Sequence, residues 1–291
     1  MDNITVTLPH LTLSGLQLGN PVKPKVLCLH GWLDNAASFA PLFEELSATH
    51  HPLLDAYHFI ALDWPGHGLS SHRGDDNYYH FVDYVDDLYQ VLTALSDEQV
   101  SIIGHSMGGM VASLFTAAFA NKVSNLILIE ALGLLTEDED PAALLQRGVL
   151  SRQAQRQKQS GIHKTIDDAV LARVRVSDLD EINARTIVRR SLEAVSGGYR
   201  WRSDPRLRTV SLMRMGIHQA IKVMHSISAN VTLIRGDTGF NSIKSAVDVF
   251  ATHIGHFQQH TINGGHHCHM QSVKSLVNVL ENTLEHPPKM R

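Results

Sequence analysis

The stretch Val100-Ser101-Ile102-Ile103-Gly104-His105-Ser106-Met107-Gly108-Gly109 decides the fold of this 291-residue chain. It places the pattern Gly-x-Ser-x-Gly between an apolar, β-branched run at 100–103 and a helix-like run at 109–120. The chain must turn sharply from strand to helix at Ser106, so we expect a strained backbone there and a hydroxyl exposed near the positive end of the helix. Small residues at 104 and 108 let neighbouring backbone pass close to the turn. The pattern predicts that Ser106 is a nucleophile rather than an incidental serine in a glycine-rich turn.

Short, almost wholly apolar runs recur on both sides of this motif. They span residues 25–29, 58–62, 100–103, 126–129 and 231–234. Residues 257–262, before the C-terminal histidines, are a further strand candidate. Such runs are typical of strands that are covered by helices on both faces. Their alternation with helix-like stretches predicts an α/β fold with a mostly parallel sheet. Residues 4–18 alternate apolar and polar side chains, which predicts an antiparallel hairpin at the sheet edge.

The strand signal disappears over residues 131–220, and the charge changes there as well. This segment holds 15 of the 25 basic residues but only 11 of the 29 acidic ones. Helix-like pieces cover 142–159, 166–174 and 179–194. We therefore predict a helical cap at 131–220 and a core domain made of 1–130 and 221–291. The arginines give a weak hint of an anionic substrate, although solvated helix faces are the preferred interpretation.

Composition narrows the class of partner. A net charge of −4 gives no reason to expect nucleic acid or an anionic membrane. The N-terminus lacks the features of a secretory signal, and the longest mostly apolar stretch, 110–120, is too short to span a bilayer. Two distant cysteines, Cys28 and Cys268, form no disulfide framework. We expect a cytoplasmic protein that acts on a small molecule, and the sequence carries no signal of its oligomeric state.

An acyl-transfer enzyme needs backbone donors aimed at the developing negative charge. The N–H of Met107, directly after the nucleophile, is one candidate. The second should follow an earlier strand, and His30-Gly31-Trp32 ends the run at 25–29. Gly31 lets the backbone approach closely, and the N–H of Trp32 is the predicted second donor. In the loop after the next strand, we assign Asp63 and His67 to holding the loop rather than to chemistry.

Four motifs together resemble the α/β-hydrolase superfamily, and most closely its serine hydrolase-like, or kraken-like, branch. The first two are His30-Gly31-Trp32-Leu33-Asp34-Asn35-Ala36-Ala37-Ser38-Phe39 and Asp63-Trp64-Pro65-Gly66-His67-Gly68-Leu69-Ser70-Ser71-His72, with Trp64 where leucine is expected. The others are Gly104-His105-Ser106-Met107-Gly108-Gly109 and Gly265-His266-His267-Cys268-His269-Met270. The resemblance runs from about residue 4 to residue 285 and is weak in the cap. It implies an eight-stranded sheet with a helical cap after strand six.

A serine nucleophile needs a base, which is usually a histidine because its pKa lies near working pH. The resemblance gives this role to His266, and the adjacent His267 is the alternative. The run His266-His267-Cys268-His269 could also suggest a metal site. Adjacent side chains rarely converge on one ion, however, so we predict no metal.

The acid that orients the histidine is the least determined member of the triad. In many members of the superfamily it lies three residues beyond a glycine after strand seven, and that position here holds Gly239. Asp237 lies two positions earlier and could reach the histidine or cap a turn. Glu130 directly follows the strand at 126–129, which should neighbour the nucleophile strand, and some superfamily members take their acid from this place. We favour Glu130 over Asp237.

These residues predict a two-step acyl transfer that needs no cofactor. A carboxylesterase acting on a small acyl substrate is the leading interpretation. A thioesterase or a carbon–carbon bond hydrolase would use the same groups. A different class, a hydrolase fold kept as a non-enzymatic binding module, is motivated by the glycine at position 239.

Overall fold

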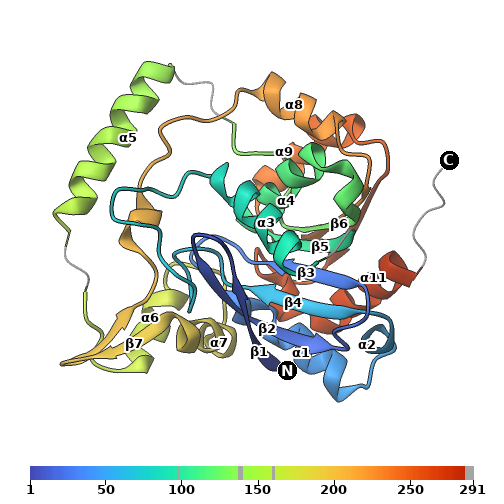
Figure 1. Cartoon of the computed structure of the whole chain (residues 1–291), viewed down its shortest axis with the longest axis horizontal. Helices are drawn as coiled ribbons and strands as arrows, with labels where there is room; N and C mark the ends of the chain where they lie inside the picture. The colour runs from blue at the N-terminus through green and yellow to red at the C-terminus, as the bar shows by residue number, and fades with distance from the viewer. Residues whose placement is uncertain (97–98, 137–139, 159–160, 286–291) are drawn as a thin grey trace.

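An eight-stranded sheet forms the centre of the computed structural model, which describes residues 1–96, 99–136, 140–158 and 161–285 (Figure 1). The strand order is β1-β2-β4-β3-β5-β6-β9-β10, and all pairs from β4 to β10 are parallel. The strands are β1 Asp2–Thr7, β2 Thr12–Gly19, β3 Lys25–Leu29, β4 His58–Leu62, β5 Val100–His105, β6 Val123–Ile129, β9 Asn230–Gly236 and β10 Phe257–Ile262. The predicted α/β fold with a mostly parallel eight-stranded sheet is confirmed.

The predicted edge hairpin is also present. β1 and β2 pair antiparallel, from Asp2 opposite Gln17 to Thr7 opposite Thr12. β2 then pairs antiparallel with β4, which joins the hairpin to the parallel part of the sheet. All five apolar runs and the candidate at 257–262 lie in strands, and β5 and β6 are next to each other as expected.

Helices cover both faces of the sheet because the strand side chains alternate between two apolar clusters. Ile102 packs with α3 (Asp83–Ala94), α4 (Met107–Ala118), α8 (Ile217–His225) and α9 (Asn241–Phe250). Its neighbour Ile103 points to the other face, which α1 (Ala40–Ala48) and α11 (Val273–Glu285) cover. The two layers lie on either side of the sheet in Figure 1. Short elements complete the core: α2 Leu53–Ala56, α10 Cys268–Gln271, and the 3-10 turns η1 Ala36–Phe39, η2 Ala120–Lys122 and η4 Ala251–His253.

The segment between β6 and α8 forms a separate layer beside the sheet (Figure 1). It contains α5 (Pro141–Arg156), α6 (Ile166–Val174), α7 (Glu181–Ser191) and the turn η3 (Pro205–Arg208). Each predicted helix-like piece holds a helix, but the piece at 179–194 was predicted too long, because residues 192–194 form a strand, and residue 159 lies outside the described residues. A hairpin of β7 (Leu192–Val195) and β8 (Gly198–Trp201) was not predicted. Its four-residue strands are too short to show an alternating pattern, and in the sequence Gly197 and Gly198 indicated only a break. In the structure these two glycines lie in the turn of the hairpin, with φ of 88° and 145°.

The division into a core and a cap at 131–220 stays a prediction, and α8 crosses its last boundary. Ala220 and Met224 of α8 are both buried in the cluster that includes α4. By packing, α8 belongs with the sheet. Among the described residues, no helix combines the length and apolarity that crossing a membrane requires.

Candidate active site

Ser106 lies at the tip of the turn between β5 and α4. Its φ is 50° and its ψ is −117°, a conformation that costs a non-glycine residue energy and is concentrated at functional sites. A Cβ at Gly104 would lie 2.6 Å from the Cα of Gly109, and one at Gly108 would lie 2.2 Å from the carbonyl oxygen of Leu29. The glycines are therefore required by close backbone contacts, as the sequence indicated. Ser106 itself is only partly buried.

The contact of Gly108 with the end of β3 brings the elbow against the loop that begins at His30. Met107 is the first residue of α4, and Trp32 lies in the loop that begins at His30. Among the described residues, neither N–H donates to a backbone carbonyl. Both predicted oxyanion donors are thus available to a ligand. The side chain of Trp32 is fixed separately, because its Nε1 donates to the carbonyl oxygen of Leu207 in the cap at 3.0 Å.

His30 is committed to holding this loop. Its Nδ1 donates to the carbonyl oxygen of Gly31 at 2.7 Å, and its Nε2 accepts from the N–H of Trp64 at 2.9 Å. Burial lowers the pKa of His30 to about 4, so the ring is neutral at physiological pH. Gly31 is tightly placed as well, since a Cβ there would lie 2.9 Å from Nδ1 of His105.

Glu130 lies next to His266. It follows β6 with φ of 47° and is 1% exposed. One carboxylate oxygen, Oε1, accepts from the N–H of Gly236 at 2.9 Å. The other, Oε2, accepts from the N–H of Phe240 at 3.1 Å and lies 3.5 Å from Nδ1 of His266. The carboxylate is thus held by two backbone donors and faces the predicted base.

Gly239 makes room for this carboxylate. A Cβ at position 239 would lie only 2.3 Å from Oε1 of Glu130. The glycine found where many superfamily members carry their acid is therefore the residue that the Glu130 side chain requires. The structure does not bring Asp237 to the histidine: it is exposed, and its Oδ1 accepts from the N–H of Gly264 at 2.9 Å, as in a turn cap.

His266 is held from two sides. Its ring stacks on that of Phe240, with centroids 4.1 Å apart and planes inclined by 18°. Its carbonyl oxygen accepts from Nε2 of His105 at 2.9 Å, so the base loop is tied to the residue directly before Ser106. The side chain remains 12% exposed, unlike that of His267, which is 6% exposed.

His267 lies in a buried ionic cluster that sequence reasoning missed. Its Nδ1 donates to Asp178 of the cap, and its backbone N–H donates to the same carboxylate at 2.9 Å. Its Nε2 lies 3.4 Å from Asp34, which also pairs with Arg173 of the cap. Burial opposes a charge on His267, but Asp34 and Asp178 outweigh it and raise its pKa to about 9. These contacts occupy both ring nitrogens of His267.

A second ion pair fastens the cap to the core. Asp63 is fully buried, and Nε of Arg190 in α7 lies 3.0 and 2.9 Å from its two oxygens. The same carboxylate accepts from the N–H groups of Ala36 at 2.7 Å and Leu69 at 2.8 Å. Asp63 therefore holds the loop, as predicted. His67 contacts the same region, where its Nδ1 donates to the carbonyl oxygen of Pro65 at 3.1 Å.

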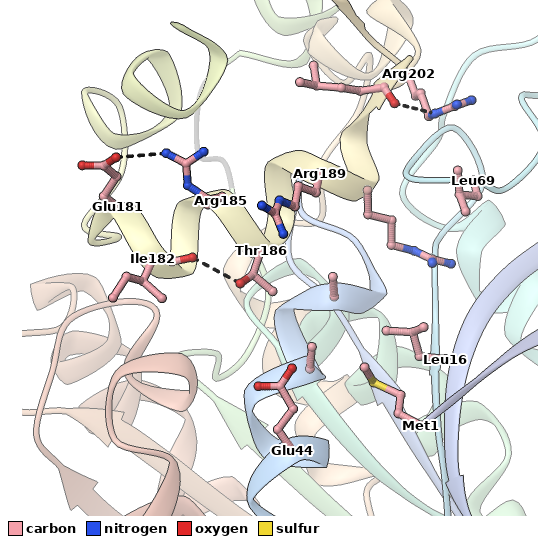
Figure 2. Close-up of a pocket in the computed structure, with 14 residues that line it drawn as sticks. Met1, Leu16, Glu44, Leu69, Glu181, Ile182, Arg185, Thr186, Arg189 and Arg202 are labelled. Carbon is pink, nitrogen blue, oxygen red and sulfur yellow. Dashed lines mark hydrogen bonds and ion pairs between the residues drawn. The ribbon is translucent and has the colours of Figure 1, made fainter. Parts of the chain in front are cut away.

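A cavity of about 740 Å³ lies between α7 and the sheet edge (Figure 2). Its lining does not include Ser106, Glu130 or His266, so it is not the catalytic pocket. Figure 2 shows Arg185 directed to Glu181, and Arg185 also pairs with Asp167 at 2.6 Å. Such pairs within the cap support the interpretation of its arginines as solvated or paired side chains.

Comparisons with known proteins agree with this geometry. Residues 24–272 match the model of the family described as alpha/beta hydrolase fold. A serine hydrolase-like protein of Danio rerio is 32% identical, over 89% of this chain and 81% of its own length. A serine hydrolase-like protein of Dictyostelium discoideum is 29% identical, over 86% of this chain and 72% of its own. The crystal structure of a hypothetical protein from Pseudomonas aeruginosa superimposes with a TM-score of 0.89 at 30% identity, covering 98% of this chain and all of that one. The chain belongs to the α/β-hydrolase family and, within it, to the relatives named serine hydrolase-like proteins.

Proposed function

We propose that this protein hydrolyses an ester bond of a small acyl substrate through a triad of Ser106, His266 and Glu130. The observation that carries the proposal is the distance of 3.5 Å between Oε2 of Glu130 and Nδ1 of His266. Catalytic hydrogen bonds are often longer before substrate binds and shorten in the complex. With Nδ1 facing Glu130, Nε2 of His266 is the nitrogen left for the serine hydroxyl.

The first step forms an acyl-enzyme. Nε2 of His266 takes the hydroxyl proton as Oγ of Ser106 bonds to the substrate carbonyl carbon. The N–H groups of Trp32 and Met107 donate to the resulting oxyanion, and Glu130 stabilises the imidazolium. When the carbon–oxygen bond breaks, the alcohol leaves with the proton from His266. Water then repeats the sequence and releases the acid.

Glu130 suits the acid role because its position is fixed. Two backbone N–H groups hold its oxygens, so little reorganisation is needed when His266 becomes charged. Because Gly239 leaves room for this side chain, the glycine no longer argues for a non-enzymatic binding module. A carboxylesterase activity remains our leading proposal, and a thioester would be attacked by the same groups. We also retain the cytoplasmic location as a proposal, since Cys28 and Cys268 are both free and buried.

Labelling with a fluorophosphonate probe tests the nucleophile. We expect the wild-type protein to be labelled and Ser106→Ala not to be, because the probe reacts only with an activated serine. Hydrolysis of short acyl esters then tests the acid, with Asp237→Asn as the matched control for Glu130→Gln. We expect a loss of about 100-fold or more in kcat for Glu130→Gln and little change for Asp237→Asn. An unlabelled but folded wild-type protein would refute the proposal.

A further inference from the structure

Three buried side chains from separate segments direct polar atoms at one another below the catalytic loops. Asp34 follows the oxyanion loop, His105 ends β5, and His267 follows the base. Nδ1 of His105, Nε2 of His267 and one carboxylate oxygen of Asp34 all lie within 4.8 Å of one another. The side chains are 1%, 6% and 1% exposed, respectively. Such a group of nitrogen and oxygen atoms has the composition of a metal site.

The protein leaves at least one of these atoms without a hydrogen bond. Nε2 of His105 must carry a proton, because it donates to the carbonyl oxygen of His266 at 2.9 Å. Nδ1 of the neutral ring is then an acceptor, and it is buried without a partner among the described residues. Oδ2 of Asp34, which lies 3.5 Å from this nitrogen, is also an acceptor. Two buried acceptors that face each other are unfavourable unless a cation or donor lies between them.

Two of the three separations match those between ligands of one ion. Oδ2 of Asp34 lies 3.5 Å from the His105 nitrogen and 3.4 Å from the His267 nitrogen. Two ligands at about 2.0–2.1 Å from a tetrahedral Zn²⁺ lie roughly 3.3 Å apart. The third pair, the two histidine nitrogens, lies within 4.8 Å.

Other groups already orient the ligands. Nδ1 of His267 donates to Asp178, so its Nε2 faces Asp34 and would bind an ion once its proton is displaced. The carbonyl oxygen of His266 fixes the His105 ring in the same way, and Arg173 binds the other oxygen of Asp34. Histidine ligands of metals are commonly oriented by such carboxylate and carbonyl partners. Asp178 has a 30% exposed side chain, so the site lies close to the surface at the edge of the cap.

We propose that Asp34, His105 and His267 bind one divalent transition-metal ion of the Zn²⁺ type, with water as the fourth ligand. Two imidazoles and one carboxylate suit Zn²⁺ rather than Mg²⁺ or Ca²⁺. The ion replaces the proton of His267 as the cation between Asp34 and Asp178. It links the oxyanion loop, the nucleophile strand and the base loop, and it takes no part in the acyl transfer. This proposal departs from the sequence-based prediction of no metal. Of the consecutive histidines it uses only His267, and the other two ligands come from distant segments.

Equilibrium dialysis of the tag-free, full-length protein against Zn²⁺ tests the site after treatment with a chelator. We expect one Zn²⁺ per chain, a rise in melting temperature on binding, and the visible absorption bands of a tetrahedral site when Co²⁺ replaces Zn²⁺. Asp34→Asn removes the anionic charge of one ligand and His105→Gln removes a ligand nitrogen, and Gln keeps a donor for the His266 carbonyl. They should weaken binding by more than the roughly 10–100-fold expected for Asp178→Asn, which removes only an orienting group.

The matched controls are His218→Gln and His256→Gln, since both histidines are exposed. We expect them to keep one high-affinity Zn²⁺ per chain. A folded wild-type protein that takes up no stoichiometric Zn²⁺ or Co²⁺ would overturn the proposal. Water molecules would then be the hydrogen-bond donors to Nδ1 of His105 and Oδ2 of Asp34. Unchanged uptake by folded Asp34→Asn and His105→Gln would also overturn it. Metal uptake is measured without substrate, so this result is independent of the esterase proposal.

Discussion

Substitution of Gly239 by alanine gives a sharp test of the proposed acid, because residue 239 contacts no substrate in the proposed mechanism. The added Cβ would lie 2.3 Å from Oε1 of Glu130, whereas ordinary contact begins near 3.4 Å. The carboxylate or the loop must therefore move by about 1 Å. Movement of the carboxylate breaks its hydrogen bonds from Gly236 and Phe240 and changes its 3.5 Å separation from His266.

The structure sets the size of the expected loss. A displacement of about 1 Å in a catalytic group costs on the order of 100-fold in rate, or about 2.7 kcal/mol of transition-state stabilisation. Complete loss of a triad acid in serine proteases costs about 10⁴-fold, which is the upper limit. We therefore expect kcat for Gly239→Ala to fall by about 10²–10⁴-fold, with a smaller effect on KM.

Steady-state hydrolysis of a short acyl ester measures this loss, with folding checked by circular dichroism. Gly255→Ala is the matched control, since a Cβ at that glycine would meet nothing within 4 Å. A folded Gly239→Ala protein with wild-type kcat would refute the reasoning that Glu130 is the acid. The double variant Glu130→Gly with Gly239→Asp moves the carboxylate to the other loop, and we expect it to recover at least about 10-fold in kcat over Glu130→Gly alone.

Two further predictions concern stability. Arg190→Met should lower the free energy of unfolding by about 3 kcal/mol or more, because it leaves the buried Asp63 carboxylate without its ion pair. The control Arg189→Met, on the exposed side of α7, should change this free energy by less than about 0.5 kcal/mol. Urea unfolding measures both variants, and equal effects would contradict the importance of the Arg190–Asp63 pair. Because burial lowers the pKa of His30 to about 4, the unfolded chain binds a proton between pH 6.5 and 4 that the folded protein excludes, so stability should fall as pH is lowered through this range. His30 contributes up to about 3 kcal/mol to this loss, and His30→Asn should show a smaller dependence on pH between 7 and 4.5.

The sheet could be predicted from sequence because its signal is local. The inner parallel strands are short apolar runs, and Ile102 and Ile103 must both be apolar since they face opposite helical layers. Ser106 was found for the same reason, because the strand, the turn and the helix are contiguous. Glu130 was favoured from one further step, the expected adjacency of β5 and β6.

The ionic cluster below the active site could not be predicted in this way. Asp178 and His267 are 89 residues apart, and Arg173 and Asp34 are 139 apart. Helical periodicity indicates which side of a cap helix is apolar, but it does not indicate which core loop that helix covers. Asp34 lies inside a motif that resembles the family's oxyanion loop, and its charge within that motif was the available signal.

The position of the proposed acid follows from the order of the strands rather than from the sequence of one loop. β6 and β9 are parallel neighbours, with Ile129 opposite Ile234, so the chain leaving each strand reaches the same edge of the sheet. Position 130 and the loop after Gly236 therefore present side chains to the same point beside His266. Only one carboxylate fits there, because the Cβ of any residue at 239 would overlap the Glu130 side chain. The glycine at 239 and the acid at 130 therefore depend on each other. Either one without the other would leave His266 without an oriented carboxylate.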